Sequence, residues 1–154
     1  MRRTFVSLAA VLVTLFVSMP ASAIEKIDPN PAAVKLITKF IKAAQIKDSK
    51  ARLAAILPML HKSMKTKDGK DLPGNVKNYS YKKACDNAKF YQTTIFEVHK
   101  GRTVTVGFKE TAEKGRKDKY FVNKKDGVAG RPAPLHVFFP ASGGAPTLIN
   151  IGSL

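Results

Sequence analysis

Residues 90–124 read FYQTTIFEVHKGRTVTVGFKETAEKGRKDKYFVNK, and this stretch decides the fold because β-branched and aromatic residues recur along it between polar ones. A period of two is typical of strands that have one buried face. Short turns at Lys100-Gly101 and at residues 113–116 divide the stretch, so we expect its strands to pair as antiparallel neighbours. The middle strand is predicted to place three apolar side chains on one face: Val104, Val106 and Phe108.

Two more strands are predicted downstream. APLHVFF, residues 133–139, has Leu135, Val137 and Phe139 on one face and His136 on the other. TLINIGSL closes the chain with Ile149 and Ile151. The C-terminal half of the sequence therefore predicts an antiparallel sheet of about four to six strands.

Two amphipathic helices are predicted before the sheet. The first begins after Asn30, a suitable N-cap, with Pro31 at the first helical position. Its apolar residues recur at helical spacing: Val34, Ile37, Ile41 and Ala44. The second begins after Asp48 or Ser49, and Pro58 is expected to kink or divide it. The apolar positions of the second helix are Leu53, Ile56, Leu57, Leu60 and Met64.

The segment between these helices and the sheet, residues 65–83, is rich in lysine, glycine and proline and is predicted to be a loop. We expect the loop to end in a short strand at about Val76–Tyr81. Residues 84–90 should either form a brief helix or lead directly into the next strand. Helices first and antiparallel strands afterwards predict an α+β domain, with the helices packed on one face of a curved, cone-like sheet.

This element order, together with the helix-to-helix passage FIKAAQIKDSKARLAAILPML at residues 40–60, resembles the nuclear transport factor 2-like superfamily, in particular its small exported bacterial members. The resemblance covers residues 31–154 and implies a cone in which a helical segment lies against a strongly bent sheet. Many members are enzymes or ligand binders with a site in the mouth of the cone, and others serve as interaction modules. The resemblance therefore leaves both kinds of function open.

The first part of the chain, residues 1–23, has the features of a secretory signal peptide. Two arginines precede the apolar run Phe5–Met19, and the small residues ASA follow at 21–23. The run has about 15 residues, fewer than the roughly 20 of a membrane-spanning helix, so we expect cleavage after Ala23 rather than a transmembrane anchor. Residues 24–154 are predicted to form a single soluble domain that is periplasmic or secreted.

The chain is strongly basic, with 27 Lys and Arg residues against 11 Asp and Glu and a formal net charge of +16. Loss of Arg2 and Arg3 with the leader lowers the charge to +14, so the excess belongs to the domain. An exported basic protein meets lipid headgroups, lipopolysaccharide phosphates, acidic wall polymers, acidic proteins or extracellular DNA. We therefore expect an anionic envelope component or an acidic protein as the partner. A specific nucleic acid is not expected, although GRKDKYFVNKKDG at residues 115–127 interleaves cations with aromatic residues as a nucleic-acid surface would.

Two clusters that combine lysine with tyrosine are the candidate binding residues. The first cluster is Tyr79, Tyr81, Lys82 and Lys83, and the second is Lys117, Lys119 and Tyr120. In strands, Tyr79 and Tyr81 would share a face, and so would Lys117 and Lys119. The alternative is structural, with tyrosines that cap the core and lysines that face water.

The sequence offers little for catalysis. No metal-ligand spacing, phosphate-cradling glycine loop or nucleophile elbow occurs, and we predict no catalytic residue, metal or cofactor. Glu97 and His99 would share a strand face, where they could form a general-base pair or be exposed polar side chains. His136 could line a pocket or lie exposed, and His61 is expected to contact helix-terminal carbonyls.

Cys85 is the only cysteine, so the chain cannot form an intramolecular disulfide. It is predicted to be a small buried residue, with a disulfide-linked homodimer as the alternative.

These features favour an exported, soluble, non-catalytic binding or interaction module for an anionic partner. One alternative is a small-molecule enzyme with its site in the cone, using His136 or the pair of Glu97 and His99. Another is a periplasmic inhibitor or immunity-type protein that blocks an acidic enzyme surface.

Overall fold

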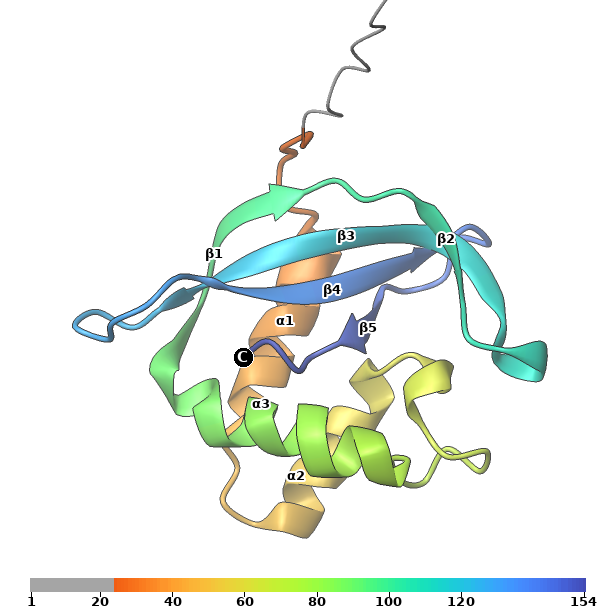
Figure 1. Cartoon of the computed structure of the whole chain (residues 1–154), viewed down its shortest axis with the longest axis horizontal. Helices are drawn as coiled ribbons and strands as arrows, with labels where there is room; N and C mark the ends of the chain where they lie inside the picture. Colours follow the sequence, from red (N-terminus) through yellow and green to blue (C-terminus); the bar gives the residue numbers. More distant parts are fainter. Residues whose placement is uncertain (1–23) are drawn as a thin grey trace, which may run out of the picture.

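A computed structural model describes residues 24–154, and the predicted signal peptide lies outside them. Helices come first and an antiparallel sheet follows, which confirms the predicted α+β class. Figure 1 shows α1 crossing behind the sheet. The helices are α1 (Pro31–Ala44), α2 (Ser49–Ile56) and α3 (Lys82–Asn87). The strands are β1 (Tyr91–His99), β2 (Thr103–Val106), β3 (Glu113–Lys124), β4 (Ala133–Pro140) and β5 (Thr147–Asn150).

The first two helices begin where the sequence predicted. The side chains of Asn30 and Asp48 accept hydrogen bonds from amides of the first turn, at 2.9 and 2.7 Å. These amides have no partner within the helix, so the caps stabilise both helix ends. Pro58 divides the second helix: α2 ends at Ile56, and a 3₁₀ turn follows at Leu57–Met59. A continuing α-helix would bring the proline ring against a carbonyl of the preceding turn.

The prediction of a strand at Val76–Tyr81 is wrong, because these residues form a π-helical turn that continues into α3. Tyr81, Ala84 and Ala88 recur at helical spacing and are all buried. These three positions lie on one face of a helix. In the sequence, the alternation of Tyr79 and Tyr81 suggested a strand instead. Because the segment is helical, Tyr79 and Tyr81 do not share a face: Tyr79 is 75% exposed and Tyr81 only 8%.

The sheet has the strand order β1-β3-β4-β5, and β2 pairs with β3 on the same edge as β1. Lys100-Gly101 is therefore a bend in one long edge strand and not the predicted hairpin turn. The Gly101 N–H donates to Asp118 Oδ1 at 2.9 Å, and a Cβ at Gly101 would collide with the carbonyl oxygen of Lys117. Only glycine lets the bend approach β3 this closely.

The second predicted turn, at residues 113–116, is also wrong, because these residues belong to β3. The chain turns at residues 107–112 instead, where Gly107 adopts a φ of 89°. Phe108 consequently leaves the face of Val104 and Val106 and is exposed.

The side of the sheet that faces α1 carries the core. Tyr120, Leu135 and Val137 are fully buried there with Ile37 and Phe40 of α1. Near the end of the chain Leu148, Ile151 and Leu154 are buried, whereas Ile149, which the sequence placed with Ile151, is only partly buried. The alternate residues of β3 and β4 form the other side, here called the open face, which is turned towards the viewer in Figure 1. Within residues 24–154, no helix has the length and apolar character needed to cross a bilayer.

Candidate functional site

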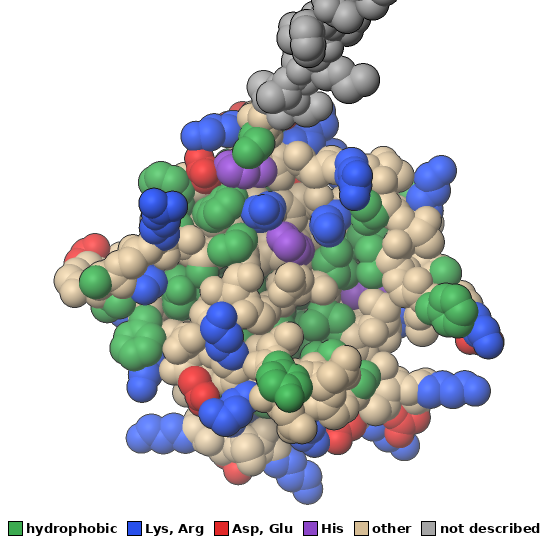
Figure 2. Space-filling model, in the orientation of Figure 1, with side chains coloured by type: hydrophobic (Ala, Val, Ile, Leu, Met, Phe, Trp, Pro, Cys, Tyr) green, Lys and Arg blue, Asp and Glu red, His purple; other side chains and the backbone are tan. Residues whose placement is uncertain are grey.

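A hollow of about 300 Å³ lies on the open face, and we call it the sheet groove. Figure 2 shows lysine, arginine and histidine side chains gathered on this side of the molecule, over β1, β3 and β4. The residues that line the groove are Ile24, His99, Lys100, Gly101, Arg102, Lys117, Lys119 and His136. None of them is a carboxylate, so the groove is a cationic hollow.

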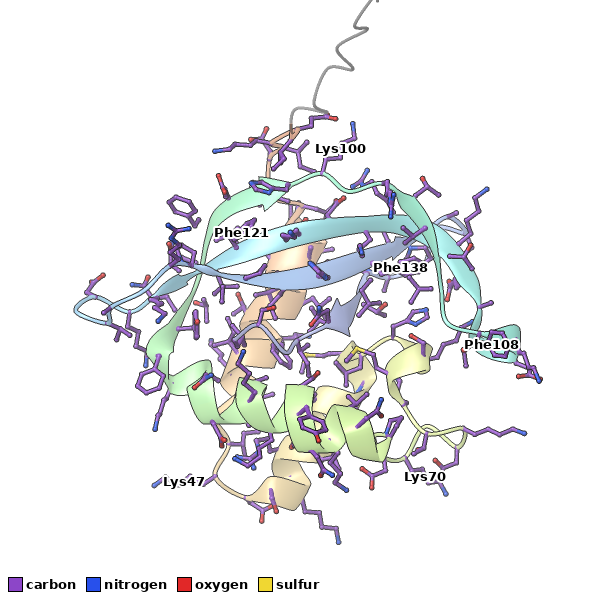
Figure 3. All side chains as sticks on the ribbon, in the orientation of Figure 1. Lys47, Lys70, Lys100, Phe108, Phe121 and Phe138 are labelled. Atoms are coloured by element: carbon purple, nitrogen blue, oxygen red, sulfur yellow. The ribbon has the colours of Figure 1, made fainter. Side chains whose placement is uncertain are left out.

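The strand register places the functional groups of the groove in a row. His99, Lys119 and His136 are direct partners across β1, β3 and β4, so all three point to the same side of the sheet. Lys117 lies two residues along β3, and it shares this side with Lys119, as the alternation predicted. Phe121, two residues beyond Lys119 on β3, and Phe138, the β4 partner of Lys117, belong to the same face and are labelled in Figure 3.

Much of the positive charge of the groove is not balanced by residues 24–154. Lys100 is paired with Glu25 at 2.8 Å. Among residues 24–154, however, neither Lys117 nor Lys119 has an ion-pair partner. The Lys119 ammonium lies 5.9 Å from the ring centroid of Phe121, a contact that orients the charge without neutralising it.

His136 is half-buried between these cations. Burial is the main cause that lowers the pKa of His136, and the charges of Lys117 and Lys119 lower it further. Both causes favour the neutral form of the imidazole.

Glu97 and His99 make the contact that the sequence suggested, with 2.9 Å between Oε1 and Nε2. Lys26 Nζ also approaches Glu97, at 2.6 Å, and this hydrogen bond is the largest cause of the lowered pKa of Glu97. His99 lowers that pKa further. A carboxylate with a lowered pKa is a weak base. The ion pair of Lys26 with Glu97 also attaches the segment before α1 to β1.

The structure separates the predicted tyrosines from the lysines beside them. Tyr120 is fully buried, and its hydroxyl accepts a hydrogen bond from the Asn30 N–H at 3.2 Å. The Tyr81 hydroxyl accepts from Arg52 Nε at 3.3 Å. Both rings cover the core, as in the structural alternative that the sequence left open, and neither offers accessible aromatic surface beside the lysines.

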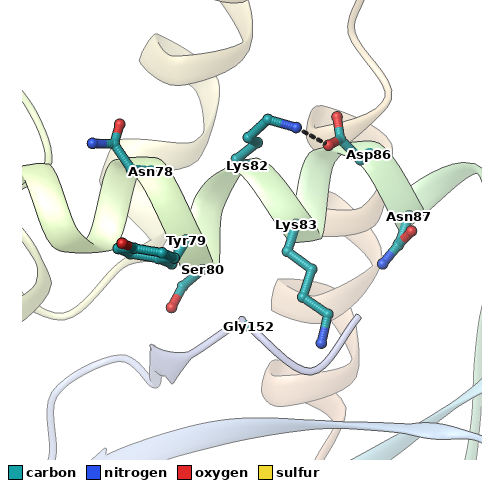
Figure 4. A pocket seen from close by; sticks show the side chains of 8 residues that line it. All are labelled: Asn78, Tyr79, Ser80, Lys82, Lys83, Asp86, Asn87 and Gly152. Atoms are coloured by element: carbon teal, nitrogen blue, oxygen red, sulfur yellow. Dashed lines mark hydrogen bonds and ion pairs between the residues drawn. The ribbon is translucent and has the colours of Figure 1, made fainter.

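The remaining residues of the first cluster, Tyr79, Lys82 and Lys83, line a second hollow of about 420 Å³, the α3 hollow. Figure 4 shows it between α3 and the chain around Gly152. Lys82 is bonded at 2.7 Å to Asp86, one helical turn further on, so its charge is balanced within the helix. This mixed charge makes the α3 hollow a weaker anion site than the sheet groove.

His61 occupies a position that the sequence did not predict. Its Nδ1 accepts a hydrogen bond from the Ser63 N–H at 3.1 Å and lies 2.8 Å from Ser63 Oγ, and its Nε2 lies 3.4 Å from Glu113 Oε2. The ring therefore caps the 3₁₀ turn Lys62–Met64 and does not bind helix-terminal carbonyls. It is 3% exposed and packs edge-on against Phe138, and burial lowers its pKa. A serine, a histidine and a glutamate meet here, but the enclosed ring is committed to a backbone amide, so we interpret the group as a structural clamp.

Cys85 is partly buried against the core, and burial raises the pKa of its thiol. Within residues 24–154, no group of three or more His, Cys, Asp or Glu side chains is placed to hold a metal ion.

The chain matches no protein-family model, and no curated protein or solved structure is significantly similar to it. Function must therefore be argued from the site itself.

Proposed function

We propose that this protein is an exported, non-catalytic binding module that holds an anionic partner in the sheet groove. The observation that carries the proposal is the pair of Lys117 and Lys119, which share the open face and have no ion-pair partner within residues 24–154. Two like charges held on one strand face repel each other, and a bound anion would remove that repulsion. The partner is an anionic envelope component or an acidic protein, whereas DNA would bind through charge alone.

A small-molecule enzyme is the second candidate, because Glu97 and His99 form a hydrogen-bonded pair at the edge of the groove. Two observations favour the binding module. Lys26 holds Glu97 in its ionised form. Asp118, which is fully buried, is engaged by Arg116 and Gly101 and lies on the side of the sheet away from the groove.

Membership of the nuclear transport factor 2-like superfamily is part of the same proposal. Its support is the order of three helices before a five-stranded antiparallel sheet, with α1 packed against β1.

Export is supported by the leader, and mass spectrometry of the protein from its native compartment should find Ile24 as the first residue. An intact Met1 would exclude cleavage.

The central experiment compares two double variants that remove the same charge. Lys117→Gln/Lys119→Gln changes the groove, whereas Lys35→Gln/Lys39→Gln changes the exposed side of α1. Binding to lipopolysaccharide, an acidic wall polymer, an acidic protein and DNA is titrated from low to physiological salt.

For the anion that the groove recognises, we expect the groove variant to weaken binding about tenfold. The α1 variant should weaken it by no more than about twofold, because only the groove lysines touch the anion. Affinity should also fall as salt rises. Equal effects of the two variants, or no binding to any anion at low salt, would overturn the proposal.

A further inference from the structure

The sheet groove has the donors for one particular kind of anionic group. His136 and Lys119 are cross-strand partners, whose Cα atoms lie about 5 Å apart, and Lys117 lies about 7 Å along β3 from Lys119. These three nitrogen-bearing side chains stand at the corners of a triangle of backbone positions, and all three line the sheet groove. A carboxylate offers two oxygens to such a triangle, whereas a phosphate group offers three strong acceptors and up to two negative charges.

Among the residues that the structure describes, those that line the groove around His136 include cations and no carboxylate. On the β3 side it faces Lys117 and Lys119, and towards β1 and the bend it faces His99 and Arg102. On the other side its partner in β5 is Asn150, which is uncharged.

The acidic side chains nearest to the groove are already engaged. Glu97 is held by Lys26 and His99, and Glu25 is held by Lys100. An entering anion would therefore be the first negative charge to reach His136, and would favour the imidazolium form.

We propose that the sheet groove binds a phosphate group, in the form of a phosphate monoester or free phosphate, and that His136 takes up a proton when the phosphate enters. This inference rests on the proposed function, and names the group that the groove recognises. Protonation adds a third positive donor only when the anion is present, so the affinity for the phosphate dianion rises as the pH falls from 8 towards 6. The lysines alone provide the weaker binding that persists at higher pH.

The test follows the His136 ring by NMR while inorganic phosphate is added to the protein. We expect phosphate to raise the pKa of His136 by about one unit, which corresponds to about tenfold tighter binding to the protonated form. Sodium acetate at the same ionic strength should leave it nearly unchanged. An unmoved His136, or an equal response to acetate, would overturn the inference.

Two variants separate His136 from its neighbours. His136→Gln should abolish proton uptake on phosphate binding and remove most of the affinity gained between pH 8 and pH 6. His99→Gln changes the other imidazole of the row; it should lower the affinity by the same factor at pH 8 and pH 6 and keep the proton uptake. If His99→Gln lost the proton uptake and His136→Gln kept it, the proton would belong to His99, and the inference would be overturned.

Vesicles distinguish the source of the phosphate. Phosphatidic acid carries a phosphate monoester headgroup, and phosphatidylcholine vesicles serve as the control. A shift of His136 with phosphatidic acid vesicles as well as with inorganic phosphate would include a lipid headgroup among the ligands, and a shift with inorganic phosphate alone would assign a soluble phosphate. Both outcomes support phosphate recognition.

The two proposals can fail separately. If Lys117→Gln/Lys119→Gln weakens polyanion binding while phosphate leaves His136 unmoved, only the inference about phosphate falls. If the lysine substitutions have no effect on any anion, both fall.

Discussion

Three consecutive residues of β3, Lys117-Asp118-Lys119, contrast the two sides of the sheet. Asp118 is fully buried and accepts hydrogen bonds from Arg116 Nε at 3.0 Å and from the Gly101 N–H at 2.9 Å. The lysines on either side of it have no ion-pair partner among residues 24–154. A charge that folding buries must be neutralised within the chain, whereas a charge on an open face can be neutralised by a ligand.

The contrast assigns different roles to neighbouring residues. Substitutions on the side that faces α1 should lower the free energy of unfolding. Substitutions in the sheet groove should change binding and leave stability nearly unchanged.

The largest difference is expected between two tyrosines. Tyr120→Ala removes a fully buried ring and should lower the free energy of unfolding by about 3–5 kcal/mol. Tyr79→Ala, at an exposed position, should change it by no more than about 0.5 kcal/mol. Urea denaturation measures both values, and similar losses would mean that the buried and exposed surfaces are assigned wrongly.

A smaller loss is expected for Asp118→Asn, about 2–3 kcal/mol by urea denaturation. The substitution leaves Arg116 without its counter-charge, but that side chain is 40% exposed and water can partly replace the carboxylate. Asp126→Asn, at an exposed turn, is the matched control and should have almost no effect. If both variants were equally stable, Asp118 would not be the residue that fixes the bend at Gly101.

Local patterns in the sequence predicted much of this fold. Asn30 and Asp48 cap their helices as expected, because a helix end needs acceptors for its free amides. The period of two correctly placed Lys117 and Lys119 on one face. The same reasoning failed at Tyr81, where two alternating tyrosines outweighed the helical spacing of Tyr81, Ala84 and Ala88.

The composition of the groove could not be predicted in this way, because it depends on pairing between distant residues. His99 and His136 meet on either side of Lys119 only through the strand register. The bend at Gly101 also depends on contacts with β3, and its sequence resembles that of an ordinary hairpin turn. Local periodicity contains no information about either feature.

Lowering the pH tests the structural clamp at His61, which packs against Phe138 of the open face. His61 and His136 both have a lowered pKa in the folded protein. Below the ordinary histidine value of 6.5 the unfolded chain therefore binds more protons than the folded chain. Stability should be complete above about pH 7 and fall as the pH drops through about 6.5, by less than the loss in Asp118→Asn.

The matched variant is His61→Asn, whose amide oxygen can still accept the Ser63 N–H. Thermal unfolding at pH 7.5 and pH 5.5 should show a smaller decrease in this variant than in the wild type. An unchanged decrease would show that His61 does not contribute to the acid sensitivity.

The smallest expected effect is a gain in the free energy of unfolding when the groove lysines are replaced. It distinguishes the two sides of the sheet most clearly, because substitutions on the side that faces α1 should lower that free energy. Lys117→Gln/Lys119→Gln removes two like charges that share a face, so it should leave the free energy of unfolding unchanged or raise it by about 0.5 kcal/mol. Salt screens this repulsion, so any gain seen by urea denaturation at low salt should disappear at high salt. Lys35→Gln/Lys39→Gln on α1 removes the same charge outside the groove and should give no comparable gain. A loss of more than about 1 kcal/mol in the groove variant would mean that these lysines stabilise the sheet, through contacts such as that of Lys119 with Phe121, and are not reserved for a ligand.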